Sequence, residues 1–234
     1  MRKLLVIAAA VAFAAPAQAV TVYSNDFEAE NGGATQTNYN GFDGLTVTDG
    51  TVDLVHTGDG FGLVCPQGTA CVDLDGSTGD AGILSSGFYA FDAGDLVTLS
   101  FTVTGNQRSG TDDIVISFDF ASAVSGTYGF SSTVSGGSFD LGSFSGTQIV
   151  LDGVNFPFDY PTDDVTFYFR ADTGGSASFS FANAGGDNIG MLLDSVALDV
   201  TAVPEPSTWA MMIGGIGMAG GSLRRRAKAR AAIA

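Results

Sequence analysis

The sequence predicts an all-β fold: an antiparallel β-sandwich of the jelly-roll type, between an N-terminal signal helix and a C-terminal transmembrane helix. First, apolar and polar residues alternate with a period of two, which is typical of strands with one buried and one exposed face. Second, Asp outnumbers Glu by 22 to three, and Asp favours turns whereas Glu favours helices. Third, Gly, Asp and Asn separate the alternating segments, and the central region shows no sustained helical stripe.

The first 19 residues have the pattern of a secretory signal peptide. A basic start, Met1–Lys3, precedes an apolar stretch over Leu4–Ala15. Ala17–Ala19 then gives the small-x-small pattern of a cleavage site ahead of Val20. Residues 1–19 are therefore expected to direct export through the Sec machinery and to be removed. An uncleaved N-terminal anchor is the alternative, which the short apolar run disfavours.

Residues 20–202 form the body, which is long enough for one domain with a packed core. In 97–104 the odd positions are apolar and the even positions are Ser or Thr. The same alternation predicts further strands at 114–120, 165–170 and 179–181. We expect Asp112–Asp113 and Asp163–Asp164 in the turns that enter strands. Several strands that each have one apolar face imply two packed sheets, with most phenylalanines in the core.

Two cysteines, Cys65 and Cys71, lie close together in the body and are the only ones in the chain. In an exported protein such a pair predicts a disulfide that fixes a hairpin loop. A metal or redox pair is the alternative. It is disfavoured because the two are not spaced as Cys-x-x-Cys and because the chain has a single histidine, His56.

The C-terminal segment combines Pro-Glu-Pro, an uncharged run over 208–223 and a cluster of cations. The run has 16 residues, whereas a helix that crosses a bilayer core needs about 20, with a lower limit near 17. A short, marginal transmembrane helix is therefore expected, with the body outside the inner membrane and the cations inside. The alternative is a buried helix of a globular domain, which the five cations within 224–230 disfavour.

This tail, residues 203–234, resembles the PEP-CTERM sorting signal in its variant with Trp-Ala after Pro-Glu-Pro. The motif spans 204–210, the apolar run 208–223 and the basic stop 224–230. The resemblance implies processing by an exosortase, transient anchoring in the inner membrane and delivery to the cell surface or matrix. The same tail is sometimes labelled an ice-binding-protein C-terminal domain, a label that says nothing of the body. The implied sorting residues are Pro204, Glu205, Pro206, Trp209, Ala210, Arg224, Arg225 and Arg226.

The body is strongly acidic once both tails are set apart. It holds 24 acidic residues against two cations, Arg108 and Arg170, and so carries a net charge of −22. Nucleic-acid binding requires clustered cations, so we expect no nucleic-acid partner. The charge also argues against peripheral binding to anionic lipid, and it favours solubility and divalent cations.

Three segments of the body resemble exported jelly-roll domains related to carbohydrate-binding modules. They are Ser-Asn-Asp-Phe-Glu at 24–28, the central run from 72 to 108 and the segment 191–198 with its Asp-x-Val. In that family the first and last strands lie side by side, and the opening Glu and closing Asp share a structural calcium.

By this resemblance Glu28 and Asp194 are the implied calcium ligands, with Asn25 and Asp26 nearby. Calcium takes six to eight oxygen ligands, and carboxylates are the commonest of them. The alternative is that Glu28 is a surface acid and Asp194 an acid at a turn or strand edge.

The same resemblance implies glycan binding, which usually relies on exposed aromatic side chains. The only Trp lies in the tail. The loop or edge aromatics of the body are Tyr39, Phe42, Phe61, Tyr89, Tyr128, Phe156, Phe158 and Tyr160. The last three are the best candidate glycan contacts, because prolines keep 155–161 out of a central strand. Packing in the core or a loop is the alternative for each.

No combination of residues indicates catalysis. A Ser-His-Asp site would depend on His56, and no Gly-x-Ser-x-Gly motif accompanies it. Phosphate-binding and dinucleotide-binding motifs are absent, and the abundance of Asp makes any pair of carboxylates uninformative. We therefore expect a non-catalytic surface or matrix protein that binds or organises exopolysaccharide. A purely structural acidic matrix protein and a secreted hydrolase are the alternatives.

Overall fold

The computed structural model describes residues 18–108, 112–134, 141–151, 163–185, 187–203 and 206–231. Its contacts divide the chain into two compact units. One is the body, Ala19–Ala202, and the other comprises the terminal segments outside it. The predicted signal helix lies outside the described residues.

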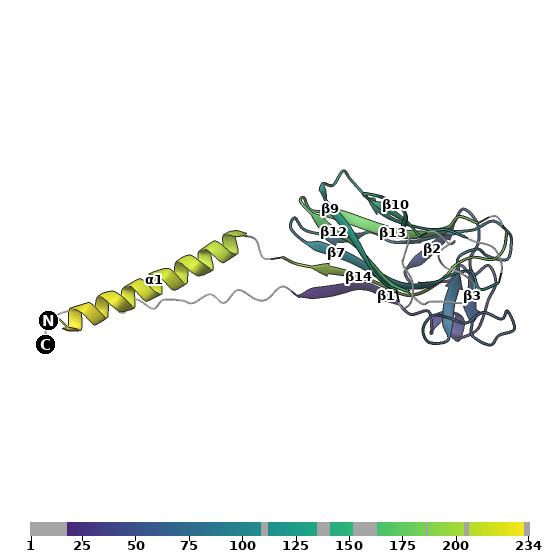
Figure 1. The fold of residues 1–234 in the computed structure, drawn as a ribbon, viewed down its shortest axis with the longest axis horizontal. Coiled ribbons are helices and arrows are strands. Elements are labelled where there is room, and N and C mark those ends of the chain that lie inside the picture. Colours follow the sequence, from purple (N-terminus) through teal and green to yellow (C-terminus); the bar gives the residue numbers. More distant parts are fainter. Residues whose placement is uncertain are drawn as a thin grey trace. The chain divides into compact units, whose positions relative to one another are not determined.

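The body is a sandwich of two antiparallel sheets that form two facing layers (Figure 1). The strands of the first sheet, in spatial order, are β3 (Asp53–His56), β4 (Ala70–Asp73), β14 (Leu192–Thr201), β7 (Leu96–Thr104), β12 (Asp163–Ala171) and β9 (Gly126–Val134), with β1 (Ala19–Asn25) also paired to β14. Those of the second are β10 (Leu141–Ser145), β11 (Gln148–Leu151), β8 (Ile114–Phe120), β13 (Gly175–Asn183), β5 (Ile83–Ser86) and β2 (Leu45–Thr48), with β6 (Tyr89–Phe91) paired to β13. A short 3-10 helix, η1 (Glu30–Gly32), follows β1.

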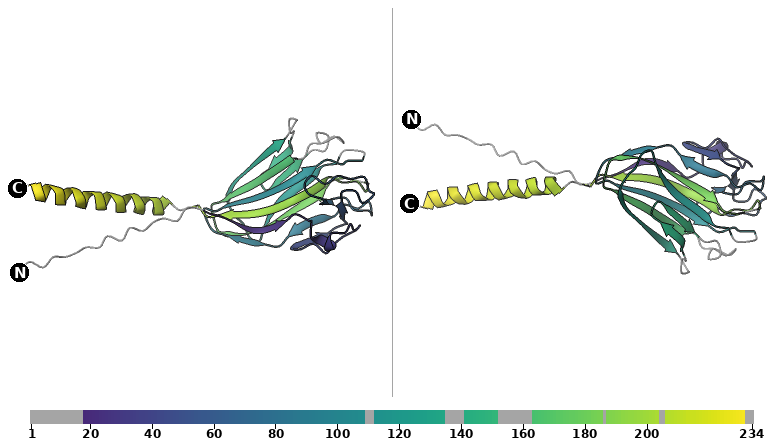
Figure 2. Two further views of the ribbon diagram at one scale, coloured as in Figure 1. Left: turned by 90° about the horizontal axis from the view of Figure 1, so that it is seen from below. Right: turned by 90° about the horizontal axis from the view of Figure 1, so that it is seen from above.

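From β7 onward the chain passes back and forth between the layers. Strands β7, β9, β12 and β14 belong to the first sheet, whereas β8, β10, β11 and β13 belong to the second. This alternation, seen from two further sides in Figure 2, is consistent with a jelly-roll-like fold. The predicted strands at 97–104, 114–120, 165–170 and 179–181 are confirmed within β7, β8, β12 and β13.

Phenylalanine rings from both sheets meet in the core between them. Phe101 of β7 packs against Phe181 of β13, with ring centroids 5.0 Å apart. Phe118 of β8 packs against Phe167 of β12 at 4.6 Å. All four side chains are buried, as the alternation predicts. Each such burial contributes about 1.5–3 kcal/mol through the hydrophobic effect.

One expectation about turns is only half right. Asp112 and Asp113 precede β8, as predicted, but Asp163 and Asp164 are the first two residues of β12. The strand begins this early because β12 pairs with β7 on one side and β9 on the other from its first residue onward. Asp164 also accepts a hydrogen bond from Thr102 Oγ1 of β7 at 2.7 Å.

Cys65 and Cys71 form the predicted disulfide, with their Cα atoms 5.4 Å apart. We call residues Cys65–Cys71 the disulfide loop. The two cysteines pack with Val55, Leu63 and Leu192 in a small buried apolar cluster. The disulfide loop is therefore held both covalently and by packing, at the end of the body where β14 begins.

The terminal unit contains the helix α1 (Pro206–Ala231). It continues past the predicted span 208–223 because the Ala, Arg and Lys residues that follow are good helix formers. Within the described ranges, no helix is both long and apolar enough to cross a bilayer, so the predicted transmembrane helix is not supported. The physical reason is that glycines occupy five positions of the short uncharged run and add no apolar side chains.

The sorting residues are placed only in part. Pro204 and Glu205 lie outside the described residues. Pro206, Trp209, Ala210 and Arg224–Arg226 all lie in α1.

Phe181→Ala should lower the free energy of unfolding by about 3–5 kcal/mol, because it leaves a cavity beside Phe101 in the core. The matched control is Phe88→Ala, since Phe88 is 55% exposed. Urea unfolding followed by circular dichroism measures both. A loss below about 1 kcal/mol in Phe181→Ala would contradict a tightly packed inter-sheet core.

Candidate functional site

Glu28 follows β1 and holds the disulfide loop. Its Oε1 accepts the backbone N–H groups of Thr69 at 2.6 Å and Ala70 at 2.9 Å. Its Oε2 accepts the Thr69 hydroxyl at 2.6 Å. These hydrogen bonds, those from Thr69 foremost, lower the pKa of Glu28. Gly68 permits the close approach, because it has φ of +52° and a Cβ there would collide with Oε1.

Asp194 of β14 binds the same loop at Gln67. It is buried, its Oδ2 accepts the N–H of Gln67 at 2.9 Å, and its Oδ1 accepts the Ser195 hydroxyl at 3.2 Å. Burial is the main reason that the pKa of Asp194 rises to about 6; the charge of Glu28 contributes to the rise, and the hydrogen bonds from Gln67 and Ser195 act against it. β1 and β14 are paired, as the resemblance implies. Glu28 and Asp194 thus both bind the disulfide loop, and each accepts at least one hydrogen bond from a backbone N–H group of that loop.

Asn25 and Asp26 stabilise the turn that follows β1. Asn25 Oδ1 accepts the N–H of Phe27 at 2.8 Å, and Asp26 Oδ1 accepts that of Glu28 at 3.3 Å. Phe27 has φ of +60°, so these bonds support a left-handed backbone. In the described parts of the chain, no three His, Cys, Asp or Glu side chains are arranged to hold a metal ion. Calcium at Glu28 and Asp194 therefore stays a prediction.

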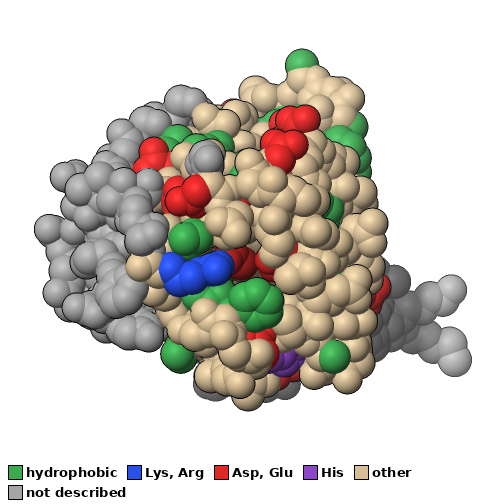
Figure 3. Space-filling view, turned by 90° about the vertical axis from the view of Figure 1, so that its right-hand side faces the viewer, with side chains coloured by type: hydrophobic (Ala, Val, Ile, Leu, Met, Phe, Trp, Pro, Cys, Tyr) green, Lys and Arg blue, Asp and Glu red, His purple; other side chains and the backbone are tan. Residues whose placement is uncertain are grey.

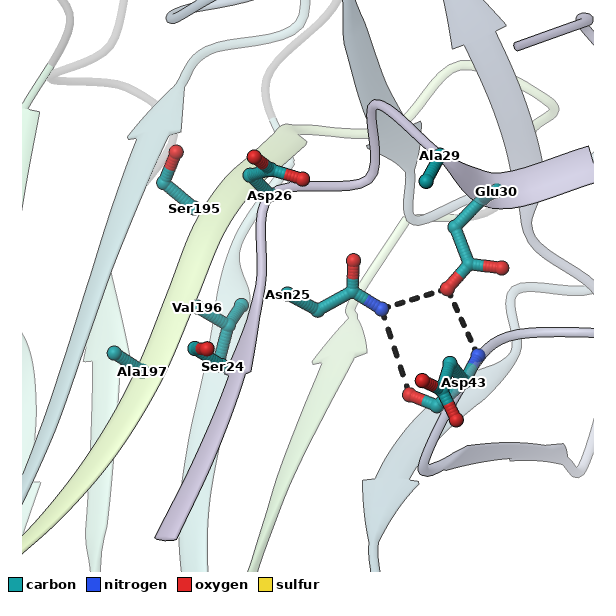
Figure 4. A pocket seen from close by; sticks show the side chains of 9 residues that line it. All are labelled: Ser24, Asn25, Asp26, Ala29, Glu30, Asp43, Ser195, Val196 and Ala197. Carbon is teal, nitrogen blue, oxygen red and sulfur yellow. Dashed lines mark hydrogen bonds between the residues drawn. The ribbon is translucent and has the colours of Figure 1, made fainter. Parts of the chain in front are cut away.

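A cavity of about 590 Å³ lies next to this turn. Figure 4 shows its lining residues, which are Ser24, Asn25, Asp26, Ala29, Glu30, Asp43, Ser195, Val196 and Ala197. Glu30 Oε1 accepts hydrogen bonds from Asn25 Nδ2 at 2.7 Å and from the N–H of Asp43 at 2.8 Å. The lining includes neither an aromatic side chain nor a cation. The cavity therefore offers hydrogen-bonding groups but no surface on which a sugar ring can stack.

A second region lies where the β3–β4 connection, just before the disulfide loop, meets the β7–β8 connection. The Gln107 side chain makes two hydrogen bonds to the backbone of Val64. Its Oε1 accepts the Val64 N–H at 2.8 Å, and its Nε2 donates to the Val64 carbonyl at 2.7 Å. Arg108 donates from Nη2 to Asp73 Oδ2 at 2.7 Å. Asp73 is 1% exposed, and burial raises its pKa to about 7, although the Arg108 charge and two backbone N–H groups act against the rise.

Exposed apolar side chains lie in the connection that Gln107 binds. Phe61 is 38% exposed and Val64 is 44% exposed, both in the β3–β4 connection. Figure 3 views this end of the body and shows hydrophobic side chains beside a cationic one, with acidic side chains next to it. We call Phe61, Val64, Asp73, Gln107 and Arg108 the loop-end face.

The aromatic residues predicted as glycan contacts differ in their burial. Tyr39 and Phe42 are buried, and Tyr89 and Tyr128 are partly buried against the core, so packing explains them. Phe61 is exposed. Phe156, Phe158 and Tyr160 lie outside the described residues.

Sequence reasoning missed Arg108 and Asp73 as site residues because 35 positions separate them. A usable signal existed. Arg108 is one of two cations in a body of 24 acids, and an isolated cation in such a chain is a strong candidate for a specific ion pair.

Residues 202–226 match the PEP-CTERM protein-sorting motif. This agrees with the resemblance drawn from Pro-Glu-Pro, Trp-Ala and the Arg cluster. No curated protein matches the chain, and no solved structure does.

Glu28→Gln should remove a stabilising contribution that depends on pH. Because the folded-state pKa of Glu28 is below its ordinary 4.5, its contribution is present above about pH 4.5 and is lost as pH falls through the folded-state value. We expect the variant to be less stable than wild type by about 1 kcal/mol at neutral pH, and the difference to shrink in acid.

Melting temperatures measured between about pH 7 and pH 3 test this. Asp26→Asn is the matched control, since Asp26 is an exposed neighbour with one backbone hydrogen bond. If the difference in melting temperature between wild type and Glu28→Gln does not shrink in acid, the charge of Glu28 is not what holds the loop.

Proposed function

We propose that the protein is a non-catalytic, surface-delivered β-sandwich that binds extracellular polysaccharide at the loop-end face. The sorting motif at 202–226 indicates exosortase-sorted export toward the cell surface. To this the proposal adds export through the Sec machinery and a polysaccharide ligand. The observation that carries the binding part is that exposed Phe61 and Val64 share one connection, which Gln107, the neighbour of Arg108, binds at Val64.

The chemistry of the loop-end face suits a sugar. A sugar ring has an apolar C–H side that packs against an aromatic face, and its hydroxyl groups bind charged donors and acceptors strongly. Phe61 supplies the aromatic face. Arg108 is 29% exposed and supplies donors, and its buried Nε has no hydrogen-bond partner within the described residues. A small-ligand site usually combines an apolar surface with a few polar groups.

The face is also rigid before any ligand binds. The disulfide, the two bonds between Gln107 and Val64, and the bonds from the loop to Glu28 and Asp194 all fix its segments. Rigidity reduces the entropy lost on binding and so favours affinity. The charge of −22 on the body favours a neutral polysaccharide, because an anionic one would be repelled.

The proposal assigns no catalytic role to the single histidine. His56 Nδ1 lies 3.3 Å from Thr35 Oγ1, and the His56 backbone N–H donates to the same oxygen at 3.0 Å. These contacts join the end of β3 to the segment before β2, which supports a structural role. Turnover of any polysaccharide by the purified protein would overturn this part.

Phe61→Ala should weaken polysaccharide binding by up to about tenfold, since an aromatic contact contributes about 0.5–1.5 kcal/mol. Isothermal titration with the neutral hit of a glycan array, or with exopolysaccharide from the producing cells, measures it. Phe88→Ala is the matched control, because Phe88 is an exposed phenylalanine between β5 and β6 of the other sheet. Equal losses in both variants, or no saturable binding by wild type, would contradict the proposal.

Glu205→Ala should block sorting, because Glu205 is the charged residue of the Pro-Glu-Pro segment within the matched motif. The wild-type protein is expected at the cell surface or in the medium with a mass that ends near Pro206. The variant is expected to stay in the cell fraction with α1 intact. Fractionation with intact mass analysis measures both, and Ser207→Ala is the control beside the motif. Surface delivery of Glu205→Ala with a trimmed tail would contradict the assignment.

A further inference from the structure

Three connections of the body meet beyond the ends of β4, β7 and β13, and they gather acidic and amide side chains. Asp75 follows β4, Asp112 precedes β8 and Asn183 ends β13. All three are buried. Asp187, exposed in the β13–β14 connection, lies close enough to raise the pKa values of Asp75 and Asp112.

Asp75 has a buried oxygen that nothing in the described structure satisfies. The residue is 1% exposed, and its Oδ1 has no hydrogen-bond partner among the described residues. Its Oδ2 lies 3.5 Å from Asn183 Nδ2, which is a long contact. A buried carboxylate oxygen without a partner is costly, so Asp75 Oδ1 is a candidate ligand for a positive group.

The charges around Asp75 add to this cost. Burial is the main reason that the pKa of Asp75 rises to about 6, and Asp187, Asp112 and Asp53 contribute by repulsion. The nearby guanidinium of Arg108 is directed to Asp73 instead, at 2.7 Å.

Asp112 and Asn183 are positioned toward the same space as Asp75. Asn106 Nδ2 donates to Asp112 Oδ2 at 2.7 Å and to the Ile189 carbonyl at 3.1 Å, which fixes the carboxylate between two connections. A Cβ added at Gly185 would lie 2.5 Å from the other oxygen, Asp112 Oδ1, and 2.6 Å from Asn183 Nδ2. Gly185 therefore leaves a polar space that any other residue would fill.

We propose that these connections form a binding site for a divalent cation, calcium by its oxygen chemistry, with Asp75 and Asp112 as carboxylate ligands and Asn183 as the amide ligand. Two buried carboxylates match the charge of a divalent ion. Asn183 Oδ1 accepts the Met191 N–H at 3.4 Å, and Nδ2 faces Asp75. A 180° turn of the amide, whose two ends are alike in shape, gives up this long contact and presents the oxygen to the ion. Backbone carbonyls and water complete the six to eight oxygens that calcium takes.

The site contains two carboxylates, so it does not conflict with the finding that, in the described ranges, no three His, Cys, Asp or Glu side chains surround one point. It shares no residue with the pair Glu28 and Asp194. The inference is independent of polysaccharide binding, because its probe is the ion alone.

The test is thermal unfolding of the full chain in EDTA and in millimolar CaCl₂, for wild type and for Asp75→Asn. Asp80→Asn is the matched control, since Asp80 is an exposed acid of the same β4–β5 connection. Glu28→Gln reports on the other predicted calcium position. We expect calcium to raise the melting temperature of wild type, Asp80→Asn and Glu28→Gln by several degrees, and not to raise that of Asp75→Asn.

In EDTA, Asp75→Asn should melt at or above the wild-type temperature, because it removes a buried charge that has no partner. Gly185→Ala provides a second variant that keeps every charge. Its Cβ enters the polar space, so calcium titration calorimetry should show at least tenfold weaker binding. No calcium response in wild type, or an undiminished response in Asp75→Asn or Gly185→Ala, would overturn the proposal.

Discussion

The packing of phenylalanine rings between the two sheets is the interaction on which the rest of the body depends. Phe101, Phe118, Phe167 and Phe181 come from four strands of both layers, and their burial holds the layers face to face. Because the chain alternates between layers from β7 onward, the packed core also brings the connections after β4, β7 and β13 to one end. The loop-end face and the group around Asp75 exist because these connections are brought together.

Acidic side chains have an unusual role at this end. With few cations in the body, carboxylates bind backbone N–H groups instead: Glu28 and Asp194 bind the disulfide loop, and Asp53 accepts the N–H groups of Asn38 and Ser77. Asp73 takes Arg108 as a partner. Asp75 differs from all of these, since one of its oxygens has no partner within the described residues. The cation site follows from this contrast rather than from the number of acids.

The sequence predicts local features well here and long-range ones poorly. Strands β7, β8, β12 and β13 are predictable because alternation is a local property, and the disulfide because the chain has two cysteines. The early start of β12 depends on its pairing with two neighbouring strands. The Arg108–Asp73 pair depends on the whole fold. Neither is therefore apparent in the sequence. Glu28 and Asp194 bind one loop, and the partners of Glu28 there are two N–H groups and a hydroxyl, so their sharing of calcium stays a prediction. The predicted transmembrane span over 208–223 is not supported within the described residues, because five glycines leave the uncharged run with few apolar side chains.

The central claim is that ligands bind at the end of the body where the connections meet. Hydrogen–deuterium exchange of the full chain, with and without the polysaccharide and CaCl₂, tests it most directly. The account predicts that slowed exchange is confined to the β3–β4 connection, to residues 74–82, 105–108 and 112–113, and to the β13–β14 connection. Slowed exchange at the cavity around Asn25 and Glu30, or along the outer strands of either sheet, with no change at this end, would contradict it.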